Sequence, residues 1–184
     1  MPVLIQSYNE SNVDADQTMQ VVDPSVGVQN SRQGLAFQTP ISTQYTLTSF
    51  KLWLKKTGLP TGTARGVLFA ATGTIETAEP TGAELAGVDF DISTLTTSYA
   101  LYEFIFTTPY TSLANTTYTV YLRNPTSGTI DASNYPSMGV KETGTGNGIN
   151  QVRYANGWIT NTRAPAYYLY GNIVGSGGGN FRFL

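Results

Sequence analysis

The sequence predicts a single all-β domain, an antiparallel sandwich or barrel, on three observations. Apolar and polar side chains alternate along several segments with the period of two that is typical of half-buried strands. Turn residues interrupt the chain at short, even intervals. Only 12% of the residues are charged, against a usual value of about 25%, and Thr, Ser, Asn, Gln and Gly supply most of the polar remainder. With 184 residues, the chain is long enough for one sizeable core and short for two domains.

Nine strands are expected, each indicated by apolar periodicity or by flanking turn residues. Residues 48–56 read TSFKLWLKK, with apolar side chains at alternate positions. The same alternation recurs in residues 88–92 and 118–123. Residues 99–106 are apolar on both faces apart from Glu103, which predicts a central strand covered on both sides. The expected strands are 34–39, 46–56, 64–71, 86–92, 99–107, 116–123, 135–141, 150–155 and 166–174.

Turns separate these strands. Pro-Thr-Gly occurs at residues 60–62 and again at 80–82; in each, the proline presets φ and the glycine tolerates a positive φ. Residues 143–150 (TGTGNGIN) are rich in glycine and typical of a loop. Short connections of this kind favour an antiparallel sandwich or barrel over a parallel α/β fold.

The chain divides into three parts. Residues 31–174 hold the expected strands and form the predicted β-sandwich domain. Residues 1–30 are mostly polar and predict an N-terminal arm or an edge segment. Residues 175–184 (GSGGGNFRFL) combine a glycine-rich hinge with an apolar end whose two phenylalanines would point to one face of an extended chain. That end is either the last strand of the domain's own sheet or an arm that docks on another subunit.

Composition excludes several kinds of chemistry. The sequence contains no Cys and no His, which excludes disulfides, thiol nucleophiles, a histidine base and zinc sites with nitrogen or sulfur ligands. The net charge is −2 and no basic run exceeds Lys55-Lys56, which argues against nucleic acid as a partner. No segment has the roughly 18 apolar residues of a membrane span, and residues 2–5 are too short for a signal-peptide core. We expect no cofactor, no membrane partner and synthesis in the cytoplasm.

Five phrases, in a fixed order, resemble a known family: LTSFKLWLKKTGLPTGTARGVLFAATGT (47–74), PTGAELAGVDFDISTLTTSYALYEFIF (80–106), NTTYTVYL (115–122), DASNY (131–135) and YANGW (154–158). They are similar to a β-sandwich family of phage and environmental virus-like genomes, and to choice-of-anchor R domains within longer secreted proteins. The resemblance covers residues 30–174 and implies a jelly-roll-like sandwich that binds or assembles rather than catalyses. It also implies a place on the virion, in a homo-oligomer that contacts other virion proteins.

Two groups of polar residues are candidate cation sites. Asp14, Asp16 and Asp23 could supply oxygen ligands to calcium, but they lack the EF-hand spacing, and a solvated loop is expected. Asp131 and Asn134 could bind calcium or hold their loop through bonds from side chain to backbone, and the second role is expected. No metal-ligating residue is therefore assigned.

Three acidic residues raise the alternative of a hydrolase. Asp89 and Asp91 lie about 7 Å apart along a strand, near the spacing of glycosidase carboxylates. Any Asp-x-Asp in a strand has that spacing, so an exposed sheet face is the expected explanation. Glu103, if buried, is expected to form a structural ion pair with Arg65 or Lys51. No catalytic residue is assigned, and the chain is predicted not to be an enzyme.

The aromatic residues are the best functional lead, because amphipathic rings are favoured at interfaces and as platforms for sugars. Tyr154 and Trp158 flank an Asn-Gly turn and are expected to be exposed. The predicted partner-binding or ligand-binding residues are Tyr135, Tyr154, Trp158, Phe181, Phe183 and Leu184. The predicted function is that of a non-enzymatic virion structural protein: a capsid decoration, a head fibre or a tail-associated binding domain. The alternative is a carbohydrate-binding module that stacks its exposed rings on a cell-surface glycan.

Overall fold

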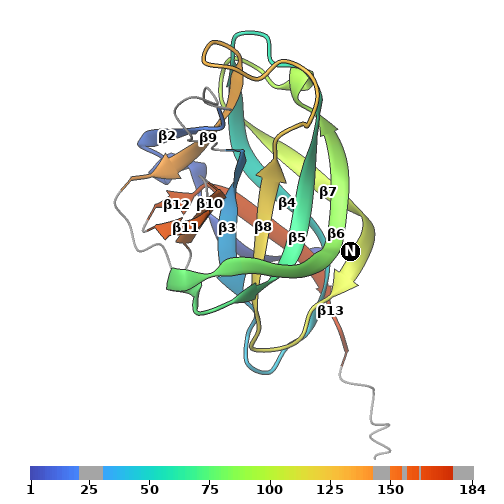
Figure 1. Ribbon diagram of the computed structural model, residues 1–184. Helices are drawn as coiled ribbons and strands as arrows, with labels where there is room; N and C mark the ends of the chain where they lie inside the picture. The colour runs from blue at the N-terminus through green and yellow to red at the C-terminus, as the bar shows by residue number, and fades with distance from the viewer. Residues whose placement is uncertain (21–30, 143–149, 155–156, 162, 176–184) are drawn as a thin grey trace, which may run out of the picture.

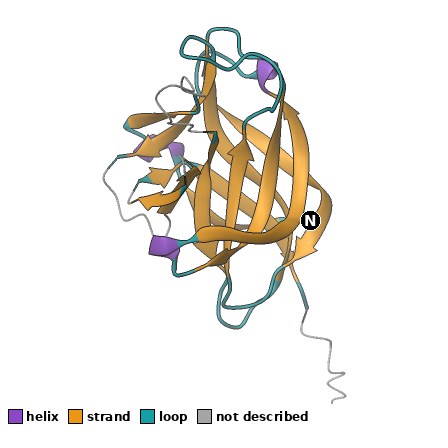
Figure 2. Ribbon diagram, viewed as in Figure 1, coloured by secondary structure: helices purple, strands orange, loops and turns teal. Residues whose placement is uncertain are grey.

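The computed structural model describes residues 1–20, 31–142, 150–154, 157–161 and 163–175, and most of them lie in strands (Figure 2). Two antiparallel sheets pack face to face (Figure 1). Three short 3₁₀ helices lie between strands: η1 (Glu10–Asn12), η2 (Ile75–Thr77) and η3 (Ile92–Thr94). The all-β sandwich predicted from the sequence is confirmed.

The strands follow one another along the chain with short connections. They are β1 (Val3–Tyr8), β2 (Ala15–Thr18), β3 (Arg32–Gln38), β4 (Tyr45–Thr57), β5 (Thr63–Thr72), β6 (Glu79–Asp91), β7 (Ala100–Thr111), β8 (Thr117–Arg123), β9 (Tyr135–Lys141), β10 (Asn150–Tyr154), β11 (Trp158–Asn161), β12 (Ala164–Pro165) and β13 (Tyr167–Ile173).

Eight of these strands have the connectivity of a jelly roll (Figure 1). They are β1, β3, β4, β5, β6, β7, β8 and β13, and we call them the frame. In the first sheet the frame strands lie in the order β1, β13, β4, β7, which are the first, eighth, third and sixth frame strands along the chain. In the second sheet the order is β3, β8, β5, β6, which are the second, seventh, fourth and fifth. This connectivity agrees with the jelly-roll-like sandwich that the resemblance implies.

The other strands form a side lobe, which we define as β2 and β9–β12. Residues 124–166, between β8 and β13, contain all of the lobe except β2. β9 pairs with the end of β4, and β2 and β12 pair with β9, so these three strands extend the first sheet. β10 pairs with β3, and β11 pairs with β10, so these two extend the second sheet. In Figure 1 the lobe lies along one side of the frame.

The core between the sheets is built from the inward side chains of both. Phe50 of β4 stacks on Phe104 of β7 with ring centroids 4.8 Å apart, and both rings are buried. Phe37 of β3 stacks on Tyr118 of β8 at 5.8 Å. Successive side chains of a strand point to opposite faces, so every second residue of these strands reaches the core. The apolar residues that alternate in the sequence are therefore the ones whose side chains fill the core.

Each of the nine predicted strands overlaps an observed one, but the description of residues 99–106 as a central strand covered on both sides is wrong. Among the described strands, β7 pairs with β4 alone, and Ile105 on its outer face is 63% exposed. The segment is apolar because Phe104 and Phe106 fill the core while an apolar residue between them faces solvent. Strands β1, β2, β11 and β12 were not predicted from the sequence.

The hairpin of β5 and β6 bends across the outer face of the second sheet (Figure 1). A register shift between Leu68 and Ala70 accompanies the bend. Beyond it, Ala78 is fully buried together with Ala36 of β3, and Trp158 of β11 packs against this pair. The arrowhead of β8 lies clear of the hairpin in Figure 1, so only part of the outer face is covered.

Candidate functional site

Six residues form a row across the outer face of the second sheet, one on each strand. Cross-strand pairing places them in this order: Trp158 (β11), Tyr154 (β10), Arg32 (β3), Arg123 (β8), Arg65 (β5) and Asp89 (β6). Directly paired residues share one face of a sheet. Leu122, the neighbour of Arg123, is fully buried in the core, so the row faces the other way. We call it the transverse row.

Two aromatic rings and one arginine form the first end of the transverse row. The guanidinium carbon of Arg32 lies 4.8 Å from the ring centroid of Tyr154 and 5.6 Å from that of Trp158, so its charge contacts both π-systems. The two rings meet edge to face with centroids 5.5 Å apart. Trp158 also contacts the buried ring of Tyr121, at 5.1 Å. Each of the two predicted exposed rings is half-buried, because Arg32 and the bent hairpin cover part of them.

Arg123 lies in the middle of the row, paired with Arg32 on one side and with Arg65 on the other. Within the described residues, neither Arg32 nor Arg123 forms an ion pair. Burial raises the pKa of the Tyr121 hydroxyl, and the charges of Arg32 and Arg123 oppose that rise. Like charges directly opposite each other destabilise a sheet, so this part of the row carries excess positive charge at a cost in stability.

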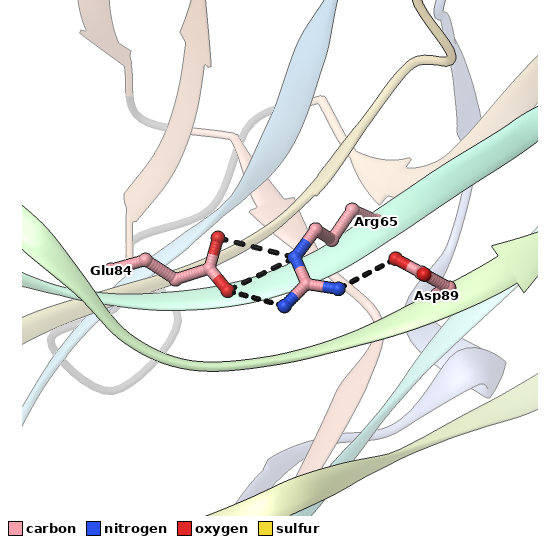
Figure 3. A network of polar contacts seen from close by, with 3 residues as sticks. All are labelled: Arg65, Glu84 and Asp89. Carbon is pink, nitrogen blue, oxygen red and sulfur yellow. Dashed lines mark hydrogen bonds and ion pairs between the residues drawn. The ribbon is translucent and has the colours of Figure 1, made fainter.

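Carboxylates neutralise the other end of the row (Figure 3). Arg65 donates to Glu84 from Nε at 3.0 Å and from Nη2 at 2.7 Å, and to Asp89 from Nη1 at 2.6 Å. Hydrogen bonds to Glu84 first, and then to Asp89, raise the pKa of Arg65. The charge of Arg65 is thus neutralised by two carboxylates. Among the described residues, the transverse row therefore has two arginines without an ion pair in its middle and an ion-pair network at this end.

The Asp-x-Asp pair on β6 is divided between two structural roles. Asp89 accepts from Arg65, as described above. Asp91 accepts from the backbone N–H of Ser93 at 2.9 Å and caps η3. Hydrogen bonds from Ser93 lower the pKa of Asp91. Both carboxylates lie on the exposed sheet face that was expected, and each already has a partner within the chain.

Glu103 lies on the other sheet, on the outer face of β7, and it is exposed. Ser49 Oγ donates to its carboxylate at 2.9 Å, and Lys51 Nζ lies 3.6 Å from it. Lys51 also contacts the ring of Tyr170, at 5.2 Å from its centroid. Of the two expected partners, Lys51 is the one that pairs with Glu103.

The candidate cation-binding residues form bonds within the chain. Asp14 pairs with Lys141, and Asp16 pairs with Lys55 and accepts from the Tyr99 hydroxyl, so these two carboxylates attach β2 to the first sheet. Asp23 lies outside the described residues. Within the described residues, no group of three or more acidic side chains could hold a metal ion.

The loop at residues 131–134 is held by its own side chains, as expected. Asp131 accepts from the backbone N–H groups of Ser133 at 2.7 Å and of Asn134 at 2.9 Å. The Asn134 side chain donates back to Asp131 at 3.0 Å and accepts from the backbone N–H of Leu59 at 2.8 Å. Both residues therefore serve the turn and its attachment to the β4–β5 loop.

Among the predicted binding residues that the structure describes, it brings together two, Tyr154 and Trp158. Tyr135 begins β9 in the first sheet, opposite Thr57, and is half-buried. Phe181, Phe183 and Leu184 lie outside the described residues. Sequence reasoning missed Arg32 and Arg123, because strand register, which makes them neighbours, cannot be read from one sequence. Only the outward position of Arg123 could be found, from the alternation in residues 118–123.

A second candidate surface lies at one end of the sandwich. The β3–β4 loop, the β7–β8 loop and the end of β13 surround a pocket of about 450 Å³ that is lined by Ile41, Ala114, Ile173 and Gly175, among others. Ile41 is 82% exposed and Ile173 is 62% exposed. Leu113, next to Ala114, is also exposed. We call this the loop-end pocket, and it presents a group of apolar side chains to solvent.

No family model matches the sequence, and no curated protein matches it significantly. In the part of the chain that the structure describes, no helix is long and apolar enough to cross a membrane. The resemblance to virus-associated sandwiches therefore stays a prediction, and the proposals that follow depend on the geometry.

Proposed function

We propose that this chain is a non-enzymatic structural protein of a virion, a jelly-roll domain that assembles with copies of itself and with other virion proteins. The observation that carries the proposal is the loop-end pocket. Ile41 and Ile173 line it and are exposed at one end of the sandwich, and Leu113, next to the lining residue Ala114, is exposed as well. Contiguous exposed apolar side chains on a soluble domain are typical of an interaction surface.

The distribution of charge supports close packing of copies. Most described cations are neutralised inside the chain, by ion pairs of Lys51, Lys55, Arg65, Lys141 and Arg163. The chain as a whole is rich in Thr, Ser, Asn and Gln, and its net charge is only −2. Neighbouring copies of such a protein repel each other weakly, because little net charge remains to act between them.

The completed frame supports a role for the C-terminal segment in assembly. β13 supplies the eighth strand of the jelly roll and ends at Ile173, and Gly175 lines the loop-end pocket. The frame is complete without residues 180–184, which carry two phenylalanines and a leucine. We assign this segment to an arm that adds to a neighbouring copy, where an extended peptide gains affinity from main-chain bonds and specificity from side-chain pockets.

Light scattering over a range of concentrations tests the assembly role. The full chain is expected to associate, and Ile41→Asp is expected to weaken the association because it places a charge in the apolar surface. The matched control is Leu59→Asp, since Leu59 is 75% exposed but lies in the loop at the opposite end of β4. A chain truncated after Ser176 is expected to be a folded monomer. A full chain that stays monomeric at every concentration would contradict the proposal.

A carbohydrate-binding module is the second candidate function. The half-exposed rings of Tyr154 and Trp158, which Arg32 orients, favour it. Rings held in place on a sheet face are suited to stacking on sugars. Glycan-array binding by the monomeric form, lost on Trp158→Ala while the thermal unfolding transition remains, is the result expected of such a module.

A further inference from the structure

One arginine of the transverse row, Arg123, has no negatively charged partner among the described residues. Arg65 has two carboxylate partners, and Arg32 contacts two rings. Arg123 lies between these two arginines and, within the described residues, forms no ion pair. Like charges on directly paired residues of neighbouring strands destabilise a sheet. Arrangements that lower the stability of the fold are expected at functional sites.

The chemistry of the row favours a singly charged, planar anion. A guanidinium group presents its donors as a rigid fork that fits a carboxylate through two parallel hydrogen bonds. The orientation of Arg32 is fixed by Tyr154 and Trp158, and that of Arg65 by Glu84 and Asp89, so the arginines on the two strands beside Arg123 are both held in place. A polyanion such as nucleic acid needs several free cations on one face, which this row does not offer.

The second element of the site is an aromatic ring at a suitable distance. Tyr154 and Arg123 lie on strands separated by β3, so their backbones are about 10 Å apart, or two strand spacings. Both side chains are long and half-buried, and both leave the same face of the sheet. A ligand that carries a carboxylate on a ring, or next to one, can contact both at once.

We propose that the transverse row binds a carboxylate-bearing saccharide, with the carboxylate on Arg123 and a sugar ring against Tyr154. The other residues of the row orient these two: Arg32 orients Tyr154, and the Arg65 network holds the sheet on the far side of Arg123. The inference goes beyond the proposed assembly role, and it deepens the second candidate function by naming the charge of the saccharide and the arginine that binds it. Self-association and saccharide binding are measured separately, so the failure of one leaves the other intact.

Nuclear magnetic resonance titration tests this site, with sialyllactose as the acidic probe and lactose as the neutral one. Sialyllactose is expected to shift backbone amide signals of β3, β8 and β10, and lactose is not. Arg123→Gln is expected to weaken sialyllactose binding about tenfold or more, as for the loss of a charge-assisted hydrogen bond. Lys56→Gln is the matched control, because it removes a cation that lies on β4 of the other sheet. Added salt is expected to weaken the binding.

Several outcomes would overturn the proposal. One is equal binding of lactose and sialyllactose, and another is unchanged binding by the Arg123→Gln variant. Stronger binding of a sulfated disaccharide at the same signals would overturn the assignment to carboxylates. The absence of any signal shift with sialyllactose would show that the transverse row is not a site for carboxylate-bearing saccharides.

Discussion

The frame and the side lobe of this molecule differ in how far they depend on polar contacts. Inside the frame the contacts are apolar: Phe50, Phe104, Leu52 and Val120 are at most 1% exposed. The lobe combines both kinds of contact: Met138 and Val140 of β9 are fully buried in the same core, whereas β2 is attached through charged and polar groups. Every strand of the frame except β1 supplies buried apolar side chains to one core, whereas β2 supplies only Gln17 as a buried residue.

The polar attachment of the lobe is extensive. Asp14 pairs with Lys141, Asp16 with Lys55, and Arg163 with Gln17 and Glu142. Buried amides add to these pairs: Gln151 donates to Gln33 at 3.1 Å, and Gln33 donates to the backbone of Thr18 at 2.6 Å. Apolar burial is insensitive to pH and strengthens with kosmotropic salts such as sulfate, whereas ion pairs weaken with both acid and salt. The two regions should therefore separate under different conditions.

A core substitution has the largest expected effect. Phe50→Ala removes a fully buried ring that stacks on Phe104, and it is expected to lower the free energy of unfolding by about 3–5 kcal/mol. Urea denaturation followed by circular dichroism measures the change. Ile105→Ala is the control, since Ile105 is 63% exposed on the neighbouring strand, and its expected effect is within about 0.5 kcal/mol. Equal losses in the two variants would mean that the frame does not depend on its core.

An anchor between the frame and the lobe comes next. Asn124, directly after β8, is buried and donates to the backbone carbonyl of Met19 at 2.9 Å. Asn124→Ala leaves that carbonyl without its donor, and the expected loss is about 1–2 kcal/mol. Hydrogen exchange should show faster opening of β2 and β9 while the strands of the frame stay protected. The control is Asn172→Ala, an exposed asparagine on β13; faster exchange throughout the frame would contradict the separation of the two regions.

Acid should loosen the lobe before the frame. Hydrogen bonds, first from Lys141 and then from the backbone of Glu142, lower the pKa of Asp14 below 3.8. Burial alone would raise the pKa of Asp16, but bonds from Lys55 and Tyr99 outweigh it and lower that pKa as well. A carboxylate with a lowered folded-state pKa stabilises the fold fully above its unfolded value, and this contribution is lost as the pH falls through the folded value.

The measurement is hydrogen exchange of β2 and β9 amides at neutral pH and at pH values below 3.8. We expect protection of these two strands to fall in acid while β5 and β8 keep theirs. The Asp16→Asn variant should show the loss of protection already at neutral pH, and a smaller further change in acid. Equal acid sensitivity of lobe and frame would show that the ion pairs do not hold β2 in place.

The sequence predicted the frame better than the lobe, for a physical reason. Strands such as 48–56 and 118–123 are half-buried, so burial appears in the sequence as alternation. β2 reads Ala-Asp-Gln-Thr and β12 is only two residues long, so neither leaves such a pattern. Their positions depend on ion pairs and amides from distant segments, and one sequence does not record these partners.

The candidate site was predicted only in part for a related reason. Tyr154 and Trp158 were found because they are aromatic and close together in the sequence. The arginines of the transverse row come from β3, β8 and β5, and only strand register makes them neighbours. Register depends on the whole sheet, so an arginine that ends a strand looks like any other solvated cation until the sheet order is known.

The smallest expected effect is at Glu103, the acidic residue that raised the alternative of a hydrolase. Glu103→Gln removes a 3.6 Å ion pair to Lys51 between side chains that are 40% and 29% exposed, and it keeps an acceptor for Ser49. Exposed ion pairs of this kind contribute about 0–1 kcal/mol, so the free energy of unfolding should change by less than about 1 kcal/mol. Urea denaturation at low and high salt measures it, with Lys51→Met as the matched change of the partner. A larger loss would mean that Glu103 supports the outer face of the first sheet, and hydrolysis of a glycan panel that this variant alone abolishes would contradict the non-enzymatic role.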